Sequence, residues 1–174
     1  MKSTKKLALS AMLTALGTVF MVLGGFIEVL DLTVCALASL LVAFVYIEIG
    51  APYYWLVWIC TSLCSALLFP GSPLWMEYLL VFGIWPILKA FVERLPRPLW
   101  LLLKLVFINA IIWALIFLMD AVFGTPFLDA DLPILKAALY VLINVAFVLY
   151  DMFITVMVRF YYDRLRKRFK TLLK

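Results

Sequence analysis

Polar and aromatic side chains recur at helical spacing within an apolar stretch near the end of the chain. Lys136, Tyr140 and Asn144 lie at i, i+4 and i+8, and Asp151 extends the same face at i+15. Burying such groups in a bilayer costs free energy, so this face is expected to turn toward a bundle interior or a water-filled cavity. The side chains on this face are suited to ligand binding. Aromatic rings can stack on a ligand, amides can fix its orientation, and charged groups can pair with a charge on it.

Two other apolar stretches carry similar faces. Asn109, Trp113 and Asp120 lie at i, i+4 and i+11 of one stretch, and Tyr78 begins a face of another, with Glu77 beside it. We expect these faces to converge on a pocket for a small polar or aromatic ligand. Its predicted residues are Trp75, Glu77, Tyr78, Asn109, Trp113, Asp120, Lys136, Tyr140 and Asn144. The alternative is an interfacial aromatic belt with hydrogen bonds between helices.

Six apolar blocks provide the helices that such faces need. A transmembrane helix takes roughly 20 mostly apolar residues to cross about 30 Å of hydrocarbon. The predicted spans are Leu7–Ile27, Leu32–Ile49, Tyr53–Phe69, Leu74–Val92, Leu99–Met119 and Leu132–Val158. Because the chain is 68% hydrophobic and 14% charged, it leaves no length for a separate soluble domain. The sequence predicts an all-α polytopic membrane protein, with residues 1–174 forming one bundle of six transmembrane helices.

Basic residues collect at alternate gaps between the blocks. They precede the first block, surround the turn between the fourth and fifth, and fill a basic tail after the sixth. They are Lys2, Lys5, Lys6, Lys89, Arg94, Arg97 and Lys104, together with those of the tail Arg159–Lys174. Since Lys and Arg near span ends stay on the cytoplasmic side, both termini are predicted to be cytoplasmic. The net charge of +5 then reflects topology and contact with anionic membrane lipids rather than nucleic-acid binding.

Residues that catalysis commonly uses are missing from the sequence. There is no His to act as acid, base or zinc ligand. There is also no Gly-x-x-x-x-Gly-Lys-Ser/Thr or Gly-x-Gly-x-x-Gly loop for a phosphate or dinucleotide. Cys35, Cys60 and Cys64 lie in apolar blocks without a Cys-x-x-Cys pair, which favours packing over metal binding or a disulfide. We therefore expect no enzyme activity, no cofactor and no metal.

The first block carries a face of small side chains. Its apolar run is too long for the core of a signal peptide, so Leu7–Ile27 is interpreted as a retained span. Ala8, Ala11 and Ala15 share one side of it. Small residues allow helices to approach closely in lipid, so this face is either a docking surface for another membrane protein or a packing surface within the same bundle.

The segment Thr4–Gly17 reads TKKLALSAMLTALG and resembles the start of the substrate-binding S components of energy-coupling factor (ECF) importers. Those bacterial cell-membrane proteins are similar in length, have six spans with both termini inside, and lack an ATPase motif. The resemblance implies that Ala11 and Ala15 dock on a transmembrane coupling subunit, which works with two cytoplasmic ATPases. It also implies that the chain captures a vitamin or a vitamin precursor from outside.

In that family the pocket opens outward and includes the first and third outer loops. The resemblance therefore implies that the loops Gly24–Asp31 and Phe69–Pro73 border the ligand. On this basis Glu28 and Asp31 join the predicted substrate-binding residues. The vitamin itself is not indicated by any pocket signature in the sequence.

Two other functions fit a small polytopic protein without catalytic residues. One is a non-catalytic scaffold or assembly factor such as the rod-shape protein MreD, although the chain lacks the expected Gly-Leu-x-x-Asp segment. The other is a self-sufficient small transporter, although the six blocks show no obvious inverted or parallel repeat. Co-purification with an ATPase pair separates the importer from the scaffold, and uptake without any ATPase favours the self-sufficient transporter.

Overall fold

The computed structural model describes residues 3–124 and 133–166, and all of the regular structure in these ranges is helical. The elements are α1 (Ser3–Phe26), η1 (Glu28–Leu30), α2 (Asp31–Glu48), α3 (Tyr53–Leu68), α4 (Leu74–Glu77), η2 (Tyr78–Phe82), α5 (Trp85–Val92), α6 (Arg97–Phe123), α7 (Pro133–Phe160) and η3 (Tyr161–Leu165). The segment η1 is a 3₁₀ turn, whereas η2 and η3 are π-helical. The all-α prediction is therefore confirmed for the described ranges.

Five of the described helical segments are long and apolar enough to cross a membrane. They are Ser3–Phe26, Asp31–Glu48, Leu74–Val92, Pro98–Phe123 and Ile134–Arg164. The remaining predicted span, Tyr53–Phe69, is also helical, but α3 has only 16 residues. At about 1.5 Å per residue α3 reaches about 24 Å, which is short of roughly 30 Å of hydrocarbon. Leu132, the predicted start of the sixth span, and the tail from residue 167 lie outside the described residues.

Proline and glycine mark the ends of the longest helices. Pro96 precedes the first turn of α6 in an extended conformation, and Pro98 lies inside that turn, where a missing N–H costs nothing. At the other end Gly124 adopts a left-handed conformation with φ +62° and donates its N–H to the Asp120 carbonyl. Gly50 has φ +83° where α2 ends. These positions favour glycine because a Cβ is strained at positive φ.

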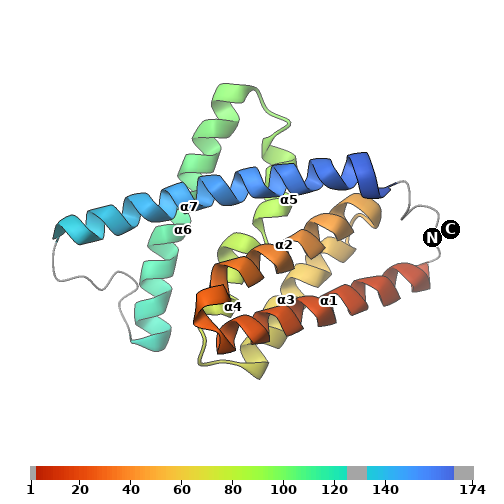
Figure 1. Ribbon diagram of the computed structural model, residues 1–174, viewed down its shortest axis with the longest axis horizontal. Helices are drawn as coiled ribbons and strands as arrows, with labels where there is room; N and C mark the ends of the chain where they lie inside the picture. The colour runs from red at the N-terminus through yellow and green to blue at the C-terminus, as the bar shows by residue number, and fades with distance from the viewer. Residues whose placement is uncertain (1–2, 125–132, 167–174) are drawn as a thin grey trace. The chain divides into compact units, whose positions relative to one another are not determined.

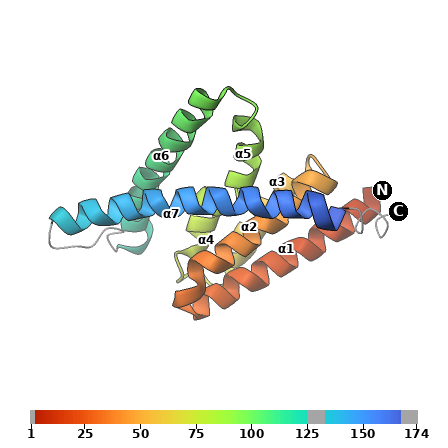
Figure 2. The ribbon, with the colours of Figure 1, turned by 45° about the horizontal axis from the view of Figure 1, so that its top comes forward.

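The chain divides into two compact units. Unit 1 comprises Met1–Lys89 and Phe153–Lys174, and unit 2 comprises Ala90–Met152. In unit 1, α1 lies along both α2 and α3 (Figures 1 and 2). The prediction that residues 1–174 form one bundle stays a prediction.

Glycines allow the close approach of α1 to its neighbours in unit 1. A Cβ added at Gly17 would lie 3.2 Å from Thr61 Cγ2 of α3, and one at Gly24 would lie 2.9 Å from Leu74 Cδ2 of α4. In a membrane, such small residues permit the van der Waals packing that holds helices together. The side of α1 that carries Gly17 is therefore its packing surface within unit 1.

A π-helical turn interrupts the fourth predicted span. The Gly83 N–H donates to the Tyr78 carbonyl at 2.7 Å, five residues back. The Trp58 Nε1–H of α3 donates to the Leu79 carbonyl at 3.1 Å. Gly83 leaves room for this indole, because a Cβ there would overlap the Trp58 ring. The turn thus fixes Tyr78 and the neighbouring part of η2 against α3, and π-turns often occur at functional sites.

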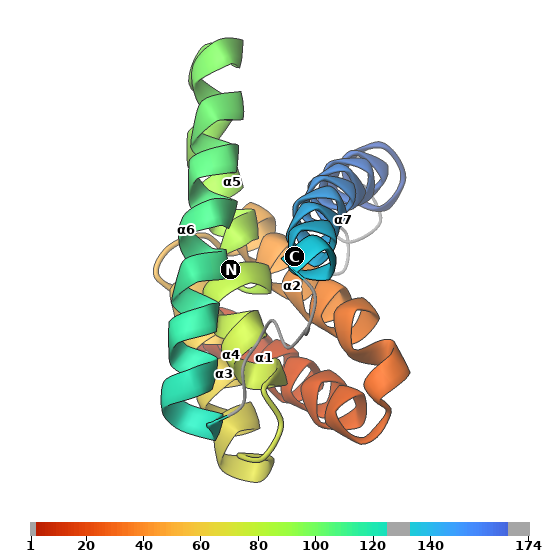
Figure 3. The same cartoon turned by 90° about the vertical axis from the view of Figure 1, so that its left-hand side faces the viewer.

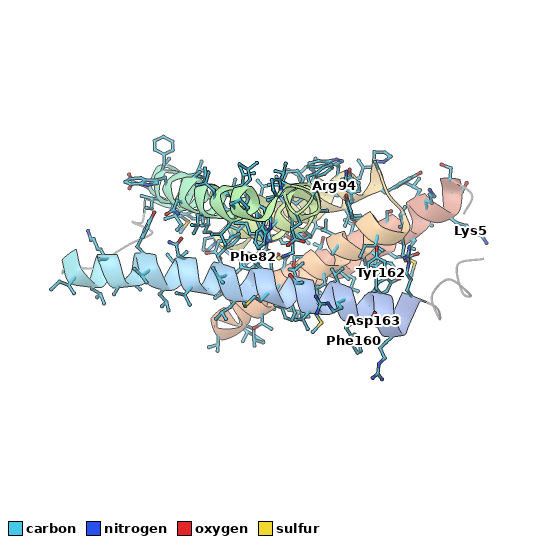
Figure 4. The ribbon with its side chains drawn as sticks, turned by 90° about the horizontal axis from the view of Figure 1, so that it is seen from above. Lys5, Phe82, Arg94, Phe160, Tyr162 and Asp163 are labelled. Atoms are coloured by element: carbon cyan, nitrogen blue, oxygen red, sulfur yellow. The ribbon has the colours of Figure 1, made fainter. Side chains whose placement is uncertain are left out.

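The last described turns, which include Tyr161 and Arg166, pack on the C-terminal end of α2 within unit 1. Arg166 Nε donates to the Glu48 carboxylate at 3.0 Å, and the Tyr161 ring meets the Phe44 ring edge-on with centroids 5.5 Å apart. Phe160, Tyr162 and Asp163 lie on the same last turns (Figure 4). The sequence predicts this end of unit 1 to be cytoplasmic.

In unit 2, α6 is one long continuous helix (Figure 3). Its buried side carries Lys104, Ile108, Ile112, Leu115 and Met119. Phe107 of α6 and Phe147 of α7 bring their ring centroids to 6.1 Å. This aromatic contact joins the two helices between the two polar contacts described below.

Candidate functional site

Four segments of unit 1 meet at the end that the sequence predicts to face outside. The Phe26 ring at the end of α1 stacks on the Phe69 ring after α3, with centroids 5.2 Å apart. A Cβ at Gly24 would approach both Leu74 of α4 and Val34 of α2. The C-terminal ends of α1 and α3 therefore lie beside the N-terminal ends of α2 and α4.

Polar side chains from three of these segments gather just inside this end. Asp31 and Cys35 come from α2, Thr61 from α3, and Glu77 and Tyr78 from the junction of α4 and η2. The carboxylates of Asp31 and Glu77 lie within electrostatic range of each other and of the Cys35 thiol. Tyr78 lies within range of Cys35 and beside Thr61. We call these five residues the Glu77 cluster.

Hydroxyl groups of the Glu77 cluster are buried without a hydrogen bond in the described structure. Tyr78 and Thr61 both have 0% exposed surface. Although the two side chains are adjacent, neither Tyr78 Oη nor Thr61 Oγ1 meets hydrogen-bond geometry with any described group. The indole N–H of Trp75, in the same short helix as Glu77, is likewise enclosed and without a described partner. Buried polar groups in proteins are nearly always hydrogen-bonded, and Tyr78 and Thr61 lie close enough for their hydroxyl groups to pair with each other after a small adjustment.

The Glu77 cluster is acidic, and the basic residues of unit 1 lie elsewhere. Lys6 donates to the Ile49 carbonyl at the opposite end of the helices, where Arg166 also pairs with Glu48. Lys89 follows Tyr78 by eleven positions, roughly 15 Å along the helix at about 1.5 Å per residue. The Lys6 and Arg166 side chains therefore lie at the opposite end of unit 1 from the Asp31 and Glu77 carboxyl groups.

The polar faces of the fifth and sixth predicted spans meet at one point in unit 2. The Tyr140 hydroxyl of α7 donates a hydrogen bond to Asn109 Oδ1 of α6. The Asn109 amide donates in turn to the Leu105 carbonyl at 2.7 Å, and the Asn144 amide donates to the Tyr140 carbonyl at 3.0 Å. This arrangement matches the alternative interpretation of the asparagines, in which they form hydrogen bonds between or along helices.

Other predicted site residues of unit 2 are exposed. Trp113 has 67% of its surface exposed, and Asp120 and Lys136 are also exposed. The polar face of α6 is thus separate from the buried face that carries Lys104 and Ile112. Within unit 2, Trp113 therefore lies away from the buried face of α6.

An ionic cluster occupies the buried face of α6 instead. Lys104 Nζ donates to the Asp151 carboxylate of α7 at 2.5 Å and lies 3.1 Å from the Glu93 carboxylate. The ammonium group also lies over the Trp100 ring, 4.3 Å from its centroid. Lys104 is 8% exposed. Charges that are paired in this way inside apolar helices frequently mark a functional or structural centre of a membrane protein.

The predicted substrate-binding residues fall into two groups. Asp31, Glu77 and Tyr78 belong to the Glu77 cluster, with Trp75 in the same short helix. Asn109, Trp113, Asp120, Lys136, Tyr140 and Asn144 belong to unit 2. Glu28 lies in η1, and its side chain is outside the described part of the structure. Convergence of the two groups on one pocket stays a prediction.

The alanine face of α1 is not buried within unit 1. Ala8, Ala11 and Ala15 are all exposed, whereas Ser10 and Gly17 are buried. Packing within unit 1 therefore does not cover this face, and both interpretations of it stay predictions. The alanines remain accessible to another helix.

No family model, curated protein or solved structure matches this chain. The resemblance of Thr4–Gly17 to ECF S components therefore stays a prediction from the sequence.

Sequence reasoning missed Thr61 and Lys104 as site residues. Thr61 lies in an apolar block that also contains Ser62 and Ser65, and no spacing distinguishes it from a packing residue. Lys104 was assigned to the cytoplasmic cations of the turn between the fourth and fifth spans. A signal was nevertheless present, because Lys104 and Asp151 are opposite charges that are both flanked by apolar residues in consecutive predicted spans.

Proposed function

We propose that this chain is the substrate-binding S component of an ECF-type importer and captures a vitamin or precursor from outside. The observation that carries the proposal is the Glu77 cluster, in which Tyr78 and Thr61 are fully buried without hydrogen-bond partners at the end predicted to face outside. A bundle that only packed would gain nothing from such groups, because an unsatisfied polar group in an apolar interior costs free energy. A bound ligand would satisfy them.

The alanine face of α1 supports the second half of the proposal. Ala8, Ala11 and Ala15 are exposed on the side away from Gly17, and small side chains let a partner helix approach closely. A coupling subunit would dock there, and two ATPases would supply the energy that this chain lacks motifs to provide. In this account the chain contributes ligand affinity and a docking face.

The proposal is tested by purifying the tagged protein from its own host in mild detergent and identifying its partners. We expect a membrane subunit together with a pair of proteins that carry the Gly-x-x-x-x-Gly-Lys-Ser/Thr motif. The variant Ala11→Trp with Ala15→Trp should lose these partners and keep its thermal stability. Leu16→Trp, which is also exposed on α1 but on a different side, is the matched control and should retain them. Association with envelope-assembly proteins alone would instead favour the scaffold.

A further inference from the structure

We infer that one end of unit 1 binds the headgroup of a net-anionic phospholipid and that arginine side chains hold its phosphate. The residues that carry the inference come from the start of α1 and from the last described turns of the chain. They are Lys5, Lys6, Arg159, Arg164 and Arg166, and we call them the basic patch. The basic patch lies at the end of unit 1 opposite the Glu77 cluster. The inference therefore goes beyond the proposed function and does not depend on it.

Contacts within unit 1 bring the two segments of the basic patch together. Lys6 Nζ donates to the carbonyl of Ile49, the residue directly after α2, at 3.3 Å. Arg166 Nε donates to the carboxylate of Glu48, the last residue of α2, at 3.0 Å. The first turns of α1 and the last described turns of the chain therefore lie beside the same end of α2.

Two arginines of the basic patch are open to a ligand. Arg159 and Arg164 are exposed, and neither forms an ion pair with a side chain in the ranges that the structure describes. Arg166, in contrast, pairs with Glu48 and lies over the Tyr162 ring, 4.6 Å from its centroid. Arg166 thus holds these turns on α2, while Arg159 and Arg164 keep their guanidinium groups for an anion. A guanidinium group can donate two parallel hydrogen bonds to one phosphate.

The basic patch carries a surplus of positive charge. Among the described residues of unit 1, the acids that accompany its five basic side chains at this end are Glu48 and Asp163. The Glu48 carboxylate is already paired with Arg166. Cations near the membrane surface attract net-anionic headgroups, and each additional Lys or Arg strengthens the attraction. The charge balance therefore favours an anionic headgroup over a zwitterionic one.

The exposed surface changes from apolar to basic on both helices that carry the basic patch. On α7, Val156 is exposed and Arg159 follows three residues later. On α1, Leu7 is exposed and Lys5 precedes it by two residues. The exposed Tyr162 lies at the same level as the cations of α7 (Figure 4), and tyrosine is enriched where hydrocarbon meets headgroups. This order places the basic patch beside lipid phosphates, which favours a headgroup over a soluble polyanion.

The test compares two phospholipids that differ in net charge. The full-length protein in a neutral detergent is titrated with phosphatidylglycerol or with phosphatidylcholine of the same acyl chains, and native mass spectrometry measures the bound lipid. Both lipids contain a phosphate, but only phosphatidylglycerol is net-anionic. We expect phosphatidylglycerol to bind at least about tenfold more tightly, and salt should reduce this preference. Equal binding of the two lipids would overturn the inference.

Substitution of the two open arginines locates the site. Arg159→Gln with Arg164→Gln should reduce the preference for phosphatidylglycerol by about tenfold and leave the Tm in neutral detergent unchanged, because both side chains are exposed. The matched control is Arg94→Gln with Lys136→Gln, which removes the same charge from exposed positions of unit 2 and should keep the preference. Equal losses in the two variants would reduce the effect to net charge and overturn the site, as would an unchanged preference in the first variant.

A soluble anion could use the same guanidinium groups, so the phosphatidylglycerol titration is repeated with an excess of inorganic phosphate at constant ionic strength. The lipid should stay bound, because its acyl chains also contact the apolar surface beside the basic patch. Displacement of the lipid by inorganic phosphate would assign the patch to a soluble phosphate and contradict the lipid assignment. Each of these results leaves the proposed function standing, since that function is tested at the Glu77 cluster and at the alanine face of α1.

Discussion

Lys104 and Asp151 form a hydrogen-bonded ion pair of 2.5 Å that joins α6 to α7. The side chains are only 10% and 15% exposed, and the Lys104 ammonium also meets Glu93 and the face of Trp100. Because most of the neighbouring residues on both helices are apolar, the pair favours one register of α6 against α7 at this point of unit 2. Removing one member would leave a charge without its partner in an apolar environment.

We predict that Lys104→Met lowers the free energy of unfolding by about 3 kcal/mol, since it breaks the buried ion pair with Asp151. Unfolding in mixed micelles measures this change. Lys136→Met, at an exposed position of α7, is the matched control and should change stability by less than about 0.5 kcal/mol. Equal effects of the two substitutions would show that the Lys104 pair does not hold the helices together.

Tyr140→Phe should destabilise the protein by about 0.6 kcal/mol, the average for a hydrogen bond between membrane helices. The substitution removes the donor to Asn109 and keeps the ring. A double-mutant cycle with Asn109→Leu should give a coupling energy of similar size. If the two effects simply add, the hydrogen bond contributes nothing to stability.

Gly83→Ala should destabilise the protein by about 1–3 kcal/mol, as overpacking does in a closely packed interior. A Cβ at Gly83 would overlap the ring of Trp58, which is held in place by its bond to the Leu79 carbonyl. Gly71→Ala is the matched control, because a Cβ there would meet nothing within 4 Å. Thermal unfolding in detergent compares the two, and a stable Gly83→Ala would contradict the packing of the π-turn.

Arg166→Gln should loosen the end of the chain from α2. The Glu48 side chain is 6% exposed and would lose its guanidinium partner, at a cost of about 1–3 kcal/mol. Faster hydrogen exchange in the last turn of α2 is the expected signature. Arg164→Gln removes an exposed charge from the same segment and should leave that exchange unchanged. Identical exchange in both variants would mean that the ion pair is not maintained in solution.

The positions of the helices could be predicted because a bilayer demands long apolar runs. The predicted boundaries lie within about four residues of the helix ends that the structure describes. The short length of α3 and the π-turn after Tyr78 were not predicted. Both depend on packing against neighbouring helices, as the hydrogen bond from Trp58 to the Leu79 carbonyl shows. The length of an apolar run carries no information about such packing.

The rotation of each helix was harder to predict than its position. Periodicity correctly placed Asn109 and Trp113 on one side of α6, but it does not say which side faces a neighbour. The buried side carries Lys104, which looked like a cytoplasmic cation because it lies near the start of its span. On α1 both sides carry small residues, and only the structure distinguishes the packed Gly17 side from the exposed Ala11 side. Of the predicted substrate-binding residues, Asp31, Glu77 and Tyr78 lie together in the Glu77 cluster.

Native mass spectrometry of the wild-type protein and of Glu77→Gln, purified gently from the native host, tests the central claim most directly. The account predicts a retained small molecule in the wild type, together with a coupling subunit and two ATPases. In Glu77→Gln the small molecule should be lost and the subunits kept. A wild-type protein without any small molecule, or equal retention by both proteins, would contradict solute capture at the Glu77 cluster.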